Sequence, residues 1–195
     1  MAPAAGAHPA AWHPGLVTFD ASVRSPADAA GPAEAERHVV HGSFTLPFDL
    51  SAPPSSVFAA FSEQPLRERW FRLPGESGTA RHELDFRVDG GEVAGSTFAS
   101  ARVREHLEYR SHFLDIVPGE RIVLAYEFLL DGRRRWVSLV TIEFAAEAGG
   151  TRLSWTEQYA FLLMTGDGRQ DVAHLRGGTR LQLNALAAVV EPPRR

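Results

Sequence analysis

The chain of 195 residues contains neither cysteine nor lysine. Without cysteine it can form no disulfide, no thiolate nucleophile and no cysteine-ligated zinc site. Without lysine it can form no Schiff base with a carbonyl substrate, and it lacks the lysine of phosphate-binding loops. These absences exclude several large classes of enzyme, and the lack of cysteine fits a reducing compartment.

Long apolar runs and an excess of basic residues are also lacking. No segment approaches the roughly 20 apolar residues that span a bilayer, and the N-terminus carries no basic patch followed by the apolar core of a secretory signal. The 20 basic residues face 24 acidic ones, so the net charge of −4 gives no support to nucleic-acid binding. We therefore expect a cytoplasmic protein with no membrane span and no nucleic-acid partner.

The first 37 residues differ in composition from the rest of the chain. They contain twelve alanines and five prolines, and their apolar residues follow no period. Such a segment cannot bury enough apolar surface to offset the entropy of ordering it. We predict a disordered tail at residues 1–37, with Trp12 and Phe19 as candidates for a short docking segment, and one folded domain at residues 38–195.

Seven segments of the domain have the pattern of β-strands. Residues 39–50 place Phe44, Leu46, Phe48 and Leu50 at a spacing of two, which is typical of a strand with one buried face. Turns containing glycine or proline recur at intervals of roughly ten residues, which indicates a meander of antiparallel strands. The other six predicted strands are residues 84–88, 97–108, 109–117, 122–130, 135–145 and 151–161.

Three further segments have helical spacing. Two short helices are predicted near residues 54–61 and 65–70, because proline opens each of them and apolar residues follow. A long amphipathic helix is predicted over residues 170–191. Its Gly177-Gly178 pair costs about 1 kcal/mol per glycine relative to alanine, so we expect another backbone segment to approach the helix there. The apolar stripe of this helix is formed by Leu175, Thr179, Leu183, Leu186 and Val190.

These elements together predict an α+β domain of the helix-grip type. One strand, two short helices, six strands and a long helix follow one another along the chain. The sheet and the long helix each have one apolar face, and each can bury it against the other. We expect a curved antiparallel sheet of six to seven strands around the C-terminal helix, with an apolar cavity between them.

Several local motifs stand in a fixed order between residues 43 and 191. They are Ala52-Pro53-Pro54-Ser55-Ser56-Val57-Phe58-Ala59-Ala60-Phe61, Arg69-Trp70-Phe71, Asp85-Phe86-Arg87-Val88 with Gly90-Gly91, Asp115-Ile116-Val117-Pro118 with Glu120-Arg121-Ile122-Val123, Gly150-Thr151-Arg152-Leu153 with Thr156-Glu157-Gln158, and Arg176 with Gly178-Thr179-Arg180. In this order they resemble bacterial homologues of the C-terminal domain of the heat-shock-protein-90 ATPase activator. That family belongs to the START-like (SRPBCC) superfamily, which includes Bet v-type, polyketide cyclase and lipid-transfer proteins.

The resemblance implies a hydrophobic cavity more firmly than it implies one activity, because fold does not determine function. The chaperone-activating role belongs to eukaryotic proteins with an additional N-terminal domain that this sequence does not contain, so we do not expect it here.

Strand parity places an aromatic-rich set of side chains on the face expected to turn toward the long helix. An apolar concavity with few polar groups is typical of a small-molecule site. Each side chain taken alone is compatible with a filled core, but the family resemblance favours a cavity for the set. The predicted lining, with Trp70-Phe71 and the long helix as the lid, is Trp70, Phe71, Leu114, Tyr126, Phe128, Trp136, Val140, Ile142, Trp155, Glu157, Tyr159, Leu175, Thr179 and Leu183.

Glu157 is the polar residue of most interest in this set. A carboxylate among apolar side chains has a raised pKa and can exchange a proton with a ligand; the alternative is a salt bridge to Arg176 or Arg180 on the long helix. His112 shares strand parity with Leu114 and is expected to face inward, either as a hydrogen-bonded core residue or as a partner of Glu157. Glu157 and His112 are therefore the candidate catalytic residues.

Three functions remain open. The first is binding of a small hydrophobic molecule, of cyclic or acyl type, with little or no catalysis. The second is a cyclase or hydrolase that uses Glu157 as general acid–base with His112 as its partner. The third is a protein-interaction or chaperone-cofactor module that uses the outer sheet face or the tail. No histidine spacing indicates a metal site and no nucleotide-binding loop is present, so neither a metal nor a cofactor is expected.

Overall fold

The computed structural model describes residues 39–101 and 103–191. The predicted disordered tail, with Trp12 and Phe19, lies outside these residues, and its boundary near residue 38 stays a prediction.

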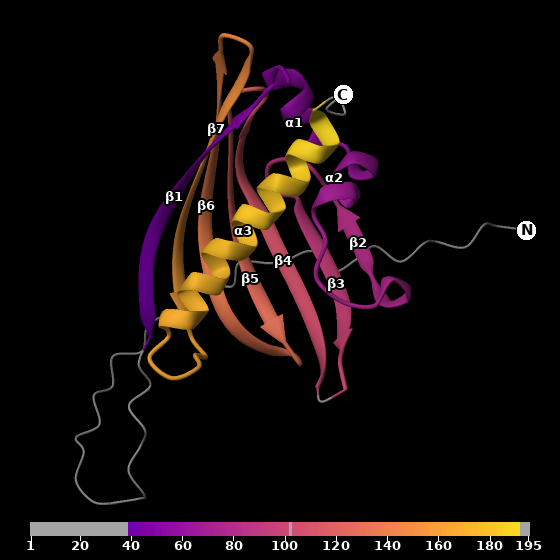
Figure 1. Cartoon of the computed structure of the whole chain (residues 1–195), viewed down its shortest axis with the longest axis vertical. Coiled ribbons are helices and arrows are strands. Elements are labelled where there is room, and N and C mark those ends of the chain that lie inside the picture. The colour runs from indigo at the N-terminus through magenta and orange to yellow at the C-terminus, as the bar shows by residue number, and fades with distance from the viewer. Residues whose placement is uncertain (1–38, 102, 192–195) are drawn as a thin grey trace, which may run out of the picture. The chain divides into compact units, whose positions relative to one another are not determined.

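Seven strands form one antiparallel sheet in the order β1-β7-β6-β5-β4-β3-β2. The long helix α3 crosses one face of the curved sheet diagonally, and α1 and α2 lie near its C-terminal end (Figure 1). This arrangement confirms the predicted helix-grip α+β fold. The elements are β1 (Val40–Leu50), α1 (Pro54–Ser62), α2 (Gln64–Trp70), a single 3-10 turn (Ser77–Thr79), β2 (Arg81–Leu84), β3 (Gly91–Ala99), β4 (Arg104–Val117), β5 (Arg121–Leu130), β6 (Arg133–Glu147), β7 (Gly150–Phe161) and α3 (Arg169–Val190).

The hydrophobic core lies between the three helices and the sheet face that carries α3, which we call the inner face. A proline opens each of the two short helices, as predicted, at a position where its missing N–H leaves no hydrogen bond unmade. The stripe of α3 that packs on the inner face has the predicted three- and four-residue spacing. Its fully or nearly buried members are Leu175, Thr179, Leu183 and Leu186.

Two strand boundaries differ from the prediction. The segment predicted as a strand at residues 84–88 is mostly irregular, because β2 ends at Leu84 and the chain enters a turn at Val88 and Asp89, where Asp89 has a φ of 64°. The predicted strands 97–108 and 109–117 are instead β3 and the continuous 14-residue β4. The hairpin between β3 and β4 is closed by the Ser100 N–H, which donates to the Val103 carbonyl at 2.8 Å. This turn was missed because β3 contains few β-branched or aromatic residues and its turn is not marked by proline or glycine.

No described segment makes the close backbone approach to the glycine pair of α3 that we expected. A Cβ built on Gly177 or Gly178 would meet no described atom within 4 Å, the backbone of α3 itself apart. The expectation is therefore wrong, and nothing in the structure explains why two glycines stand there.

Candidate functional site

A hydrogen-bonded network surrounds Glu157, which lies on the inner face and is 0% exposed. Its Oε1 accepts hydrogen bonds from the Tyr126 hydroxyl at 2.5 Å and the Ser138 hydroxyl at 2.7 Å, and its Oε2 accepts one from Trp155 Nε1 at 3.1 Å. Trp136 Nε1 donates in turn to the Tyr126 oxygen at 3.0 Å. We call these five residues the Glu157 network.

The regular register of β5, β6 and β7 brings the network together. Tyr126 pairs with Ser138, and Glu157 pairs with Val140, so the side chains of each pair emerge on the same face. Because alternate residues of a strand share a face, Trp136, Ser138 and Val140 all point toward α3. The parity that the sequence predicted for these three strands therefore matches the structure.

Burial raises the pKa of the Glu157 carboxyl. Hydrogen bonds from Tyr126, Ser138, Trp155 and Thr179 act in the opposite direction and lower the pKa, but the net shift is upward. The predicted alternative, a salt bridge to Arg176 or Arg180, is not formed, since the partners are uncharged and the Arg180 guanidinium lies over the Phe48 ring at 5.6 Å. Glu157 is thus a buried acid held by neutral donors.

Several aromatic side chains beside the network are only partly covered. Phe128 and Trp136 stack with ring centroids 4.2 Å apart and an interplanar angle of 11°, so one face of each ring covers the other and the pair forms an apolar block on the inner face. Both rings remain partly exposed to solvent, as do Tyr126 and Tyr159. Side chains that fill a closed core are covered completely, so this part of the inner face is less completely covered than its surroundings.

The other predicted lining residues on the sheet and α3 are more fully covered. Val140 and Leu183 are 0% exposed, and the rest are nearly so. They belong to the packed core beneath α3, on either side of Glu157. This group consists of Val140, Ile142, Trp155, Leu175, Thr179 and Leu183.

The prediction that His112 and Leu114 face inward is wrong. A β-bulge between Phe113 and Asp115 shifts the register of β4 against β5. The bulge reverses the parity of the residues before it, so Phe113 is buried while Leu114 is 46% exposed. His112 lies on the same outer face as Leu114, with its Nε2 3.7 Å from Asp89 Oδ1. His112 and Glu157 are therefore on opposite faces of the sheet, and they cannot act on one substrate.

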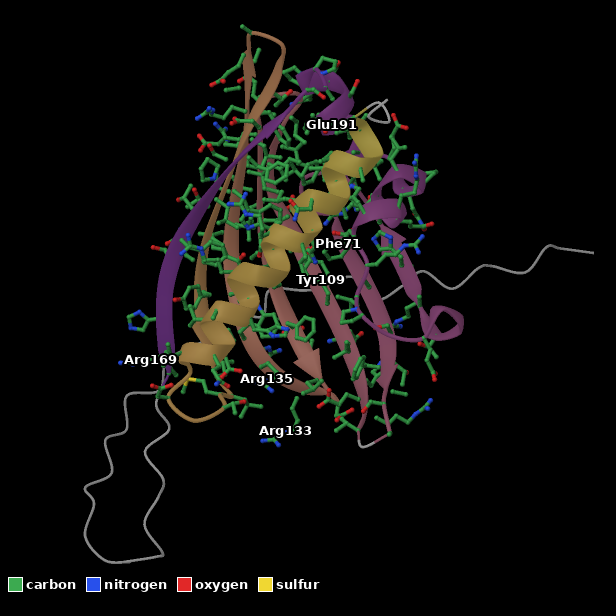
Figure 2. All side chains as sticks on the ribbon, viewed as in Figure 1. Phe71, Tyr109, Arg133, Arg135, Arg169 and Glu191 are labelled. Carbon is green, nitrogen blue, oxygen red and sulfur yellow. The ribbon has the colours of Figure 1, made fainter. Side chains whose placement is uncertain are left out.

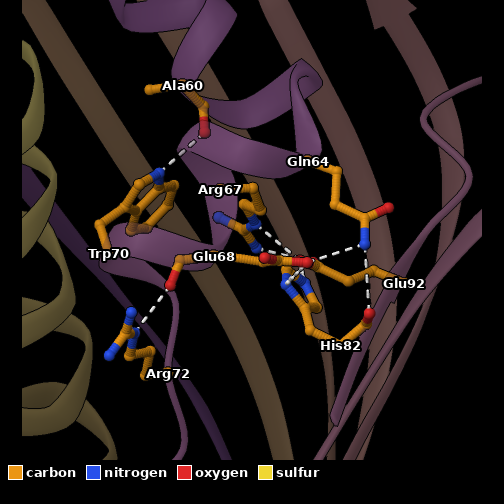
Figure 3. Close-up of polar contacts among 8 residues, drawn as sticks. All are labelled: Ala60, Gln64, Arg67, Glu68, Trp70, Arg72, His82 and Glu92. Carbon is orange, nitrogen blue, oxygen red and sulfur yellow. Dashed lines mark hydrogen bonds and ion pairs between the residues drawn. The ribbon is translucent and has the colours of Figure 1, made fainter.

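A second buried cluster, which the sequence interpretation missed, joins α2 to β2 and β3. The Arg67 guanidinium donates from Nε and Nη2 to the two carboxylate oxygens of Glu92, each at 2.7 Å, and His82 Nε2 lies 2.6 Å from Glu92 Oε1 (Figure 3). Arg67 is 3% exposed and Glu92 is 0% exposed. We call these three residues the Arg67 cluster.

The charges of the Arg67 cluster compensate one another. Burial alone would raise the pKa of Glu92, but the neighbouring Arg67 guanidinium and the hydrogen bonds from Arg67 and His82 hold the pKa below its ordinary value. The guanidinium carbon also lies 4.3 Å from the ring centroid of Trp70 and 4.1 Å from that of Phe71. The guanidinium thus packs against two roughly perpendicular rings, and its Nη1 is buried without a hydrogen-bond acceptor among the described residues.

The predicted lid residues Trp70 and Phe71 are thus part of this packing. Trp70 Nε1 donates to the Ala60 carbonyl at 2.8 Å, which ties α2 to α1. Phe71 packs against Tyr109 with ring centroids 4.8 Å apart in the interior (Figure 2), and Tyr109 in turn lies 5.0 Å from the Tyr126 ring. A line of three aromatic rings therefore connects the Arg67 cluster to the Glu157 network.

Two sequence signals could have indicated the Arg67 cluster. Glu92 alternates with Ala94 and Ser96 on one side of a strand, and small side chains on a buried face leave room for a large partner. Arg67 lies one helical turn from Trp70 on α2. The pairing itself spans 25 residues and depends on the tertiary fold, so no local spacing predicts it.

Neither a metal site nor a membrane-spanning helix occurs in the part of the chain that the structure describes. No group of three or more histidine, aspartate or glutamate side chains there is arranged to hold a metal ion. Within the same residues, every helix is too short or too polar to cross a membrane.

Comparison with protein families gives one match that covers most of the domain. The model of the family described as "Activator of Hsp90 ATPase homolog 1-like protein" matches residues 51–191. That range begins just after β1 and ends at the last described residue, so it contains both buried clusters. Among curated proteins no match to this chain is found.

Solved structures of similar sequence and fold are also found. An uncharacterized protein from Rhizobium leguminosarum is 35% identical, with a TM-score of 0.69 over 79% of this chain and 97% of the other. A protein from Rhizobium loti is 37% identical, with a TM-score of 0.66 over 78% of this chain and 99% of the other. An AHSA1-like protein from Aeromonas hydrophila, 18% identical with a TM-score of 0.53 over 77% and 92%, supports the fold alone.

Proposed function

This chain belongs to the activator of Hsp90 ATPase homolog 1-like family, and on that premise we propose that it binds a small, mainly apolar molecule on the inner face of its sheet, next to α3. The Phe128–Trp136 stack provides the apolar floor, and the Glu157 network orients one polar group of the bound molecule.

The observation that carries this proposal is the difference in side-chain exposure between two parts of the inner face. Around Val140 and Leu183 the side chains are fully buried, whereas Phe128 and Trp136 are partly exposed although they face α3. Aromatic side chains left uncovered beside a few convergent polar groups are typical of small-molecule sites. Because aromatic rings pack well against one another, also edge to face, the exposed parts of the stack favour a molecule with a ring.

The competing enzyme hypothesis loses its stated basis. It required Glu157 and His112 within reach of one substrate, and the two residues lie on opposite faces of the sheet. No second general acid or base in the Glu157 network replaces His112, since its other members are hydroxyl and indole groups with no ordinary titration near neutral pH. A role as a protein-interaction module stays a prediction.

Native mass spectrometry tests the proposal directly. The purified protein is expected to carry, or to take up from a cell extract, one small molecule per chain, and Trp136→Ala is expected to lose it while remaining folded. Trp155→Ala is a poorer test, because that indole is buried and its removal would cost about 3–5 kcal/mol of stability. Leu114→Ala, on the outer face, is the matched control and should retain the adduct.

Solution NMR covers the case in which the protein purifies without a ligand. The chain has four tryptophans, so its indole N–H resonances form a small set that reports on Trp136 and Trp155. Titration with 1-naphthylmethanol should shift these two resonances saturably. If the protein carries no adduct and its indole resonances do not respond to naphthalene probes, ligand binding at the inner face is contradicted.

A further inference from the structure

When Glu157 is ionised, the direction of every hydrogen bond in the Glu157 network is determined by chemistry. An indole N–H can only donate, so Trp136 donates to the Tyr126 oxygen and Trp155 donates to Glu157 Oε2. The Tyr126 hydroxyl has one hydrogen, and it is directed at Glu157 Oε1 at 2.5 Å. Ser138 likewise directs its single hydroxyl hydrogen at Oε1. Hydrogen bonds therefore run in one direction, from Trp136 through Tyr126 to Glu157.

This arrangement uses all the donors of the network and leaves only acceptors. The Thr179 hydroxyl, the polar group that α3 brings to this region, directs its single hydrogen either at the Leu175 carbonyl, 3.1 Å away, or at Glu157. What remains available is a lone pair on the Tyr126 oxygen and one on Glu157 Oε2. A polar group that meets this network must therefore donate a hydrogen bond, because a carbonyl or a carboxylate would face oxygen lone pairs.

The network also carries a charge that its own members do not balance. Glu92 has Arg67 and His82 as partners, but in the described residues no ion pair joins Glu157 to a cation. A buried carboxylate without a cationic partner is costly to the fold and attracts either a proton or a positive ligand.

We propose that the molecule bound at the inner face carries a protonated amine, which donates to the Tyr126 oxygen and supplies the positive charge that Glu157 lacks. The apolar part of the molecule lies on the Phe128–Trp136 stack. Because Glu157 itself is fully buried, the ammonium group meets Tyr126 first and lies one hydrogen bond away from the carboxylate. This inference rests on the proposed function, since it specifies the chemical class of ligand for the same site.

The test uses three probes that share one ring system and differ in one polar group: 1-naphthylmethylamine, 1-naphthylmethanol and 1-naphthylacetic acid. At neutral pH the first is a cation, the second a neutral donor and the third an anion. Affinities for the full chain are measured by isothermal titration calorimetry, with the indole N–H resonances as the check that binding occurs at Trp136. The amine should bind at least about tenfold more tightly than the alcohol, and the acid should bind most weakly.

Variants of the protein test whether the charge of the probe, rather than its shape, determines its affinity. Glu157→Gln and Tyr126→Phe should bring the amine-to-alcohol affinity ratio close to about one, with the alcohol affinity changed by less than about threefold. Glu143→Gln, which removes an exposed outer-face carboxylate on β6, is the matched control and should keep the wild-type ratio. If either network variant fails to fold, the three wild-type affinities still decide the matter.

Failure of the amine proposal can be distinguished from failure of the proposed function. If the alcohol binds at Trp136 and the acid binds as tightly as the amine or more tightly, the amine proposal is overturned while ligand binding stands. If none of the three probes binds or moves the Trp136 and Trp155 resonances, the proposed function fails and this inference fails with it.

Discussion

Two buried carboxylates in this molecule have opposite environments. Glu92 receives a two-point ion pair from Arg67 and a contact from His82, and its pKa is lowered. Glu157 receives hydrogen bonds from hydroxyl and indole groups alone, and burial raises its pKa. Both are 0% exposed, so burial does not distinguish them; the charge of their partners does.

The difference separates a structural group from a candidate binding group. The ion pair with Arg67 uses both carboxylate oxygens of Glu92 and holds α2 against the sheet, so this carboxylate has no unbalanced charge to offer a ligand. A buried carboxylate held by neutral donors retains an unbalanced charge and free lone pairs beside partly exposed rings. Substitutions around the two carboxylates should therefore differ in what they damage, stability at Glu92 and ligand affinity at Glu157.

Removal of Arg67 should have the largest effect on stability. Arg67→Met leaves Glu92 buried without its cation and should lower the free energy of unfolding by about 3–5 kcal/mol in urea denaturation. The double variant Arg67→Met/Glu92→Leu should lose less than Arg67→Met alone, because no charge is then left unpaired. Arg72→Met, in which an exposed arginine bonded to the Glu68 carbonyl is replaced, should change the value by less than about 0.5 kcal/mol. Equal losses of stability for Arg67→Met and Arg72→Met would show that the buried Arg67 cluster contributes no more than an exposed arginine.

Removal of the Trp136 ring should have the largest effect on ligand affinity. Trp136→Ala deletes half of the Phe128–Trp136 stack and should weaken 1-naphthylmethanol binding by about tenfold or more, or about 1.4 kcal/mol, as measured by calorimetry. The melting temperature should show that the variant is folded. Unchanged affinity in a folded Trp136→Ala protein would remove this ring from the site.

The two carboxylates should give pH dependences of opposite sign. The raised pKa of Glu157 means that its contribution to stability is present below the ordinary glutamate pKa and is lost as pH rises through the folded-state value. The lowered pKa of Glu92 means that its contribution is present above the ordinary pKa and is lost as pH falls through the folded-state value.

These signs can be measured by unfolding the wild type, Glu157→Gln and Glu92→Gln from acid to neutral pH. As pH rises, the free energy of unfolding of the wild type should fall relative to that of Glu157→Gln. Over the same pH range it should rise relative to that of Glu92→Gln. A tenfold difference in the acid dissociation constant between the folded and unfolded chain corresponds to about 1.4 kcal/mol of stability. Slopes of the same sign for both variants would contradict the comparison.

The smallest effect on stability is expected from a substitution on the outer face of the sheet. Leu114→Ala should change the free energy of unfolding by less than about 0.5 kcal/mol, because the side chain is exposed beyond the bulge, whereas Phe113→Ala should cost about 3–5 kcal/mol. A large loss for Leu114→Ala would place the bulge elsewhere in β4.

The sequence predicted the parts of the molecule in which strand alternation runs without interruption. Trp136, Ser138 and Val140 were assigned to the inner face correctly because β5, β6 and β7 keep one register along their central residues. His112 and Leu114 were assigned wrongly because one extra residue in β4 reverses the alternation, and a bulge has no sequence signature here. Periodicity indicates which residues share a face only as long as no residue is inserted between them.

The partners of the buried carboxylates were harder to predict from the sequence than the faces of the strands. Glu157 was recognised as an inward carboxylate, but the expected arginine partners on α3 are replaced by Tyr126, Ser138 and Trp155 from the sheet. The Arg67 cluster was not anticipated, because its members come from three elements that meet only in the folded chain. Such contacts are a property of tertiary packing rather than of local spacing.

The sharpest experiment is a carbon-13 NMR titration of the glutamate side-chain carboxyls, with and without 1-naphthylmethylamine. The resonance that disappears in Glu157→Gln should titrate above the ordinary glutamate pKa of about 4.3 in the free protein, and its midpoint should move to lower pH when the cationic probe binds. The resonance that disappears in Glu92→Gln should titrate below that value and should not respond to the probe. A Glu157 carboxyl that titrates below the ordinary value, or that ignores a bound amine, would contradict the account.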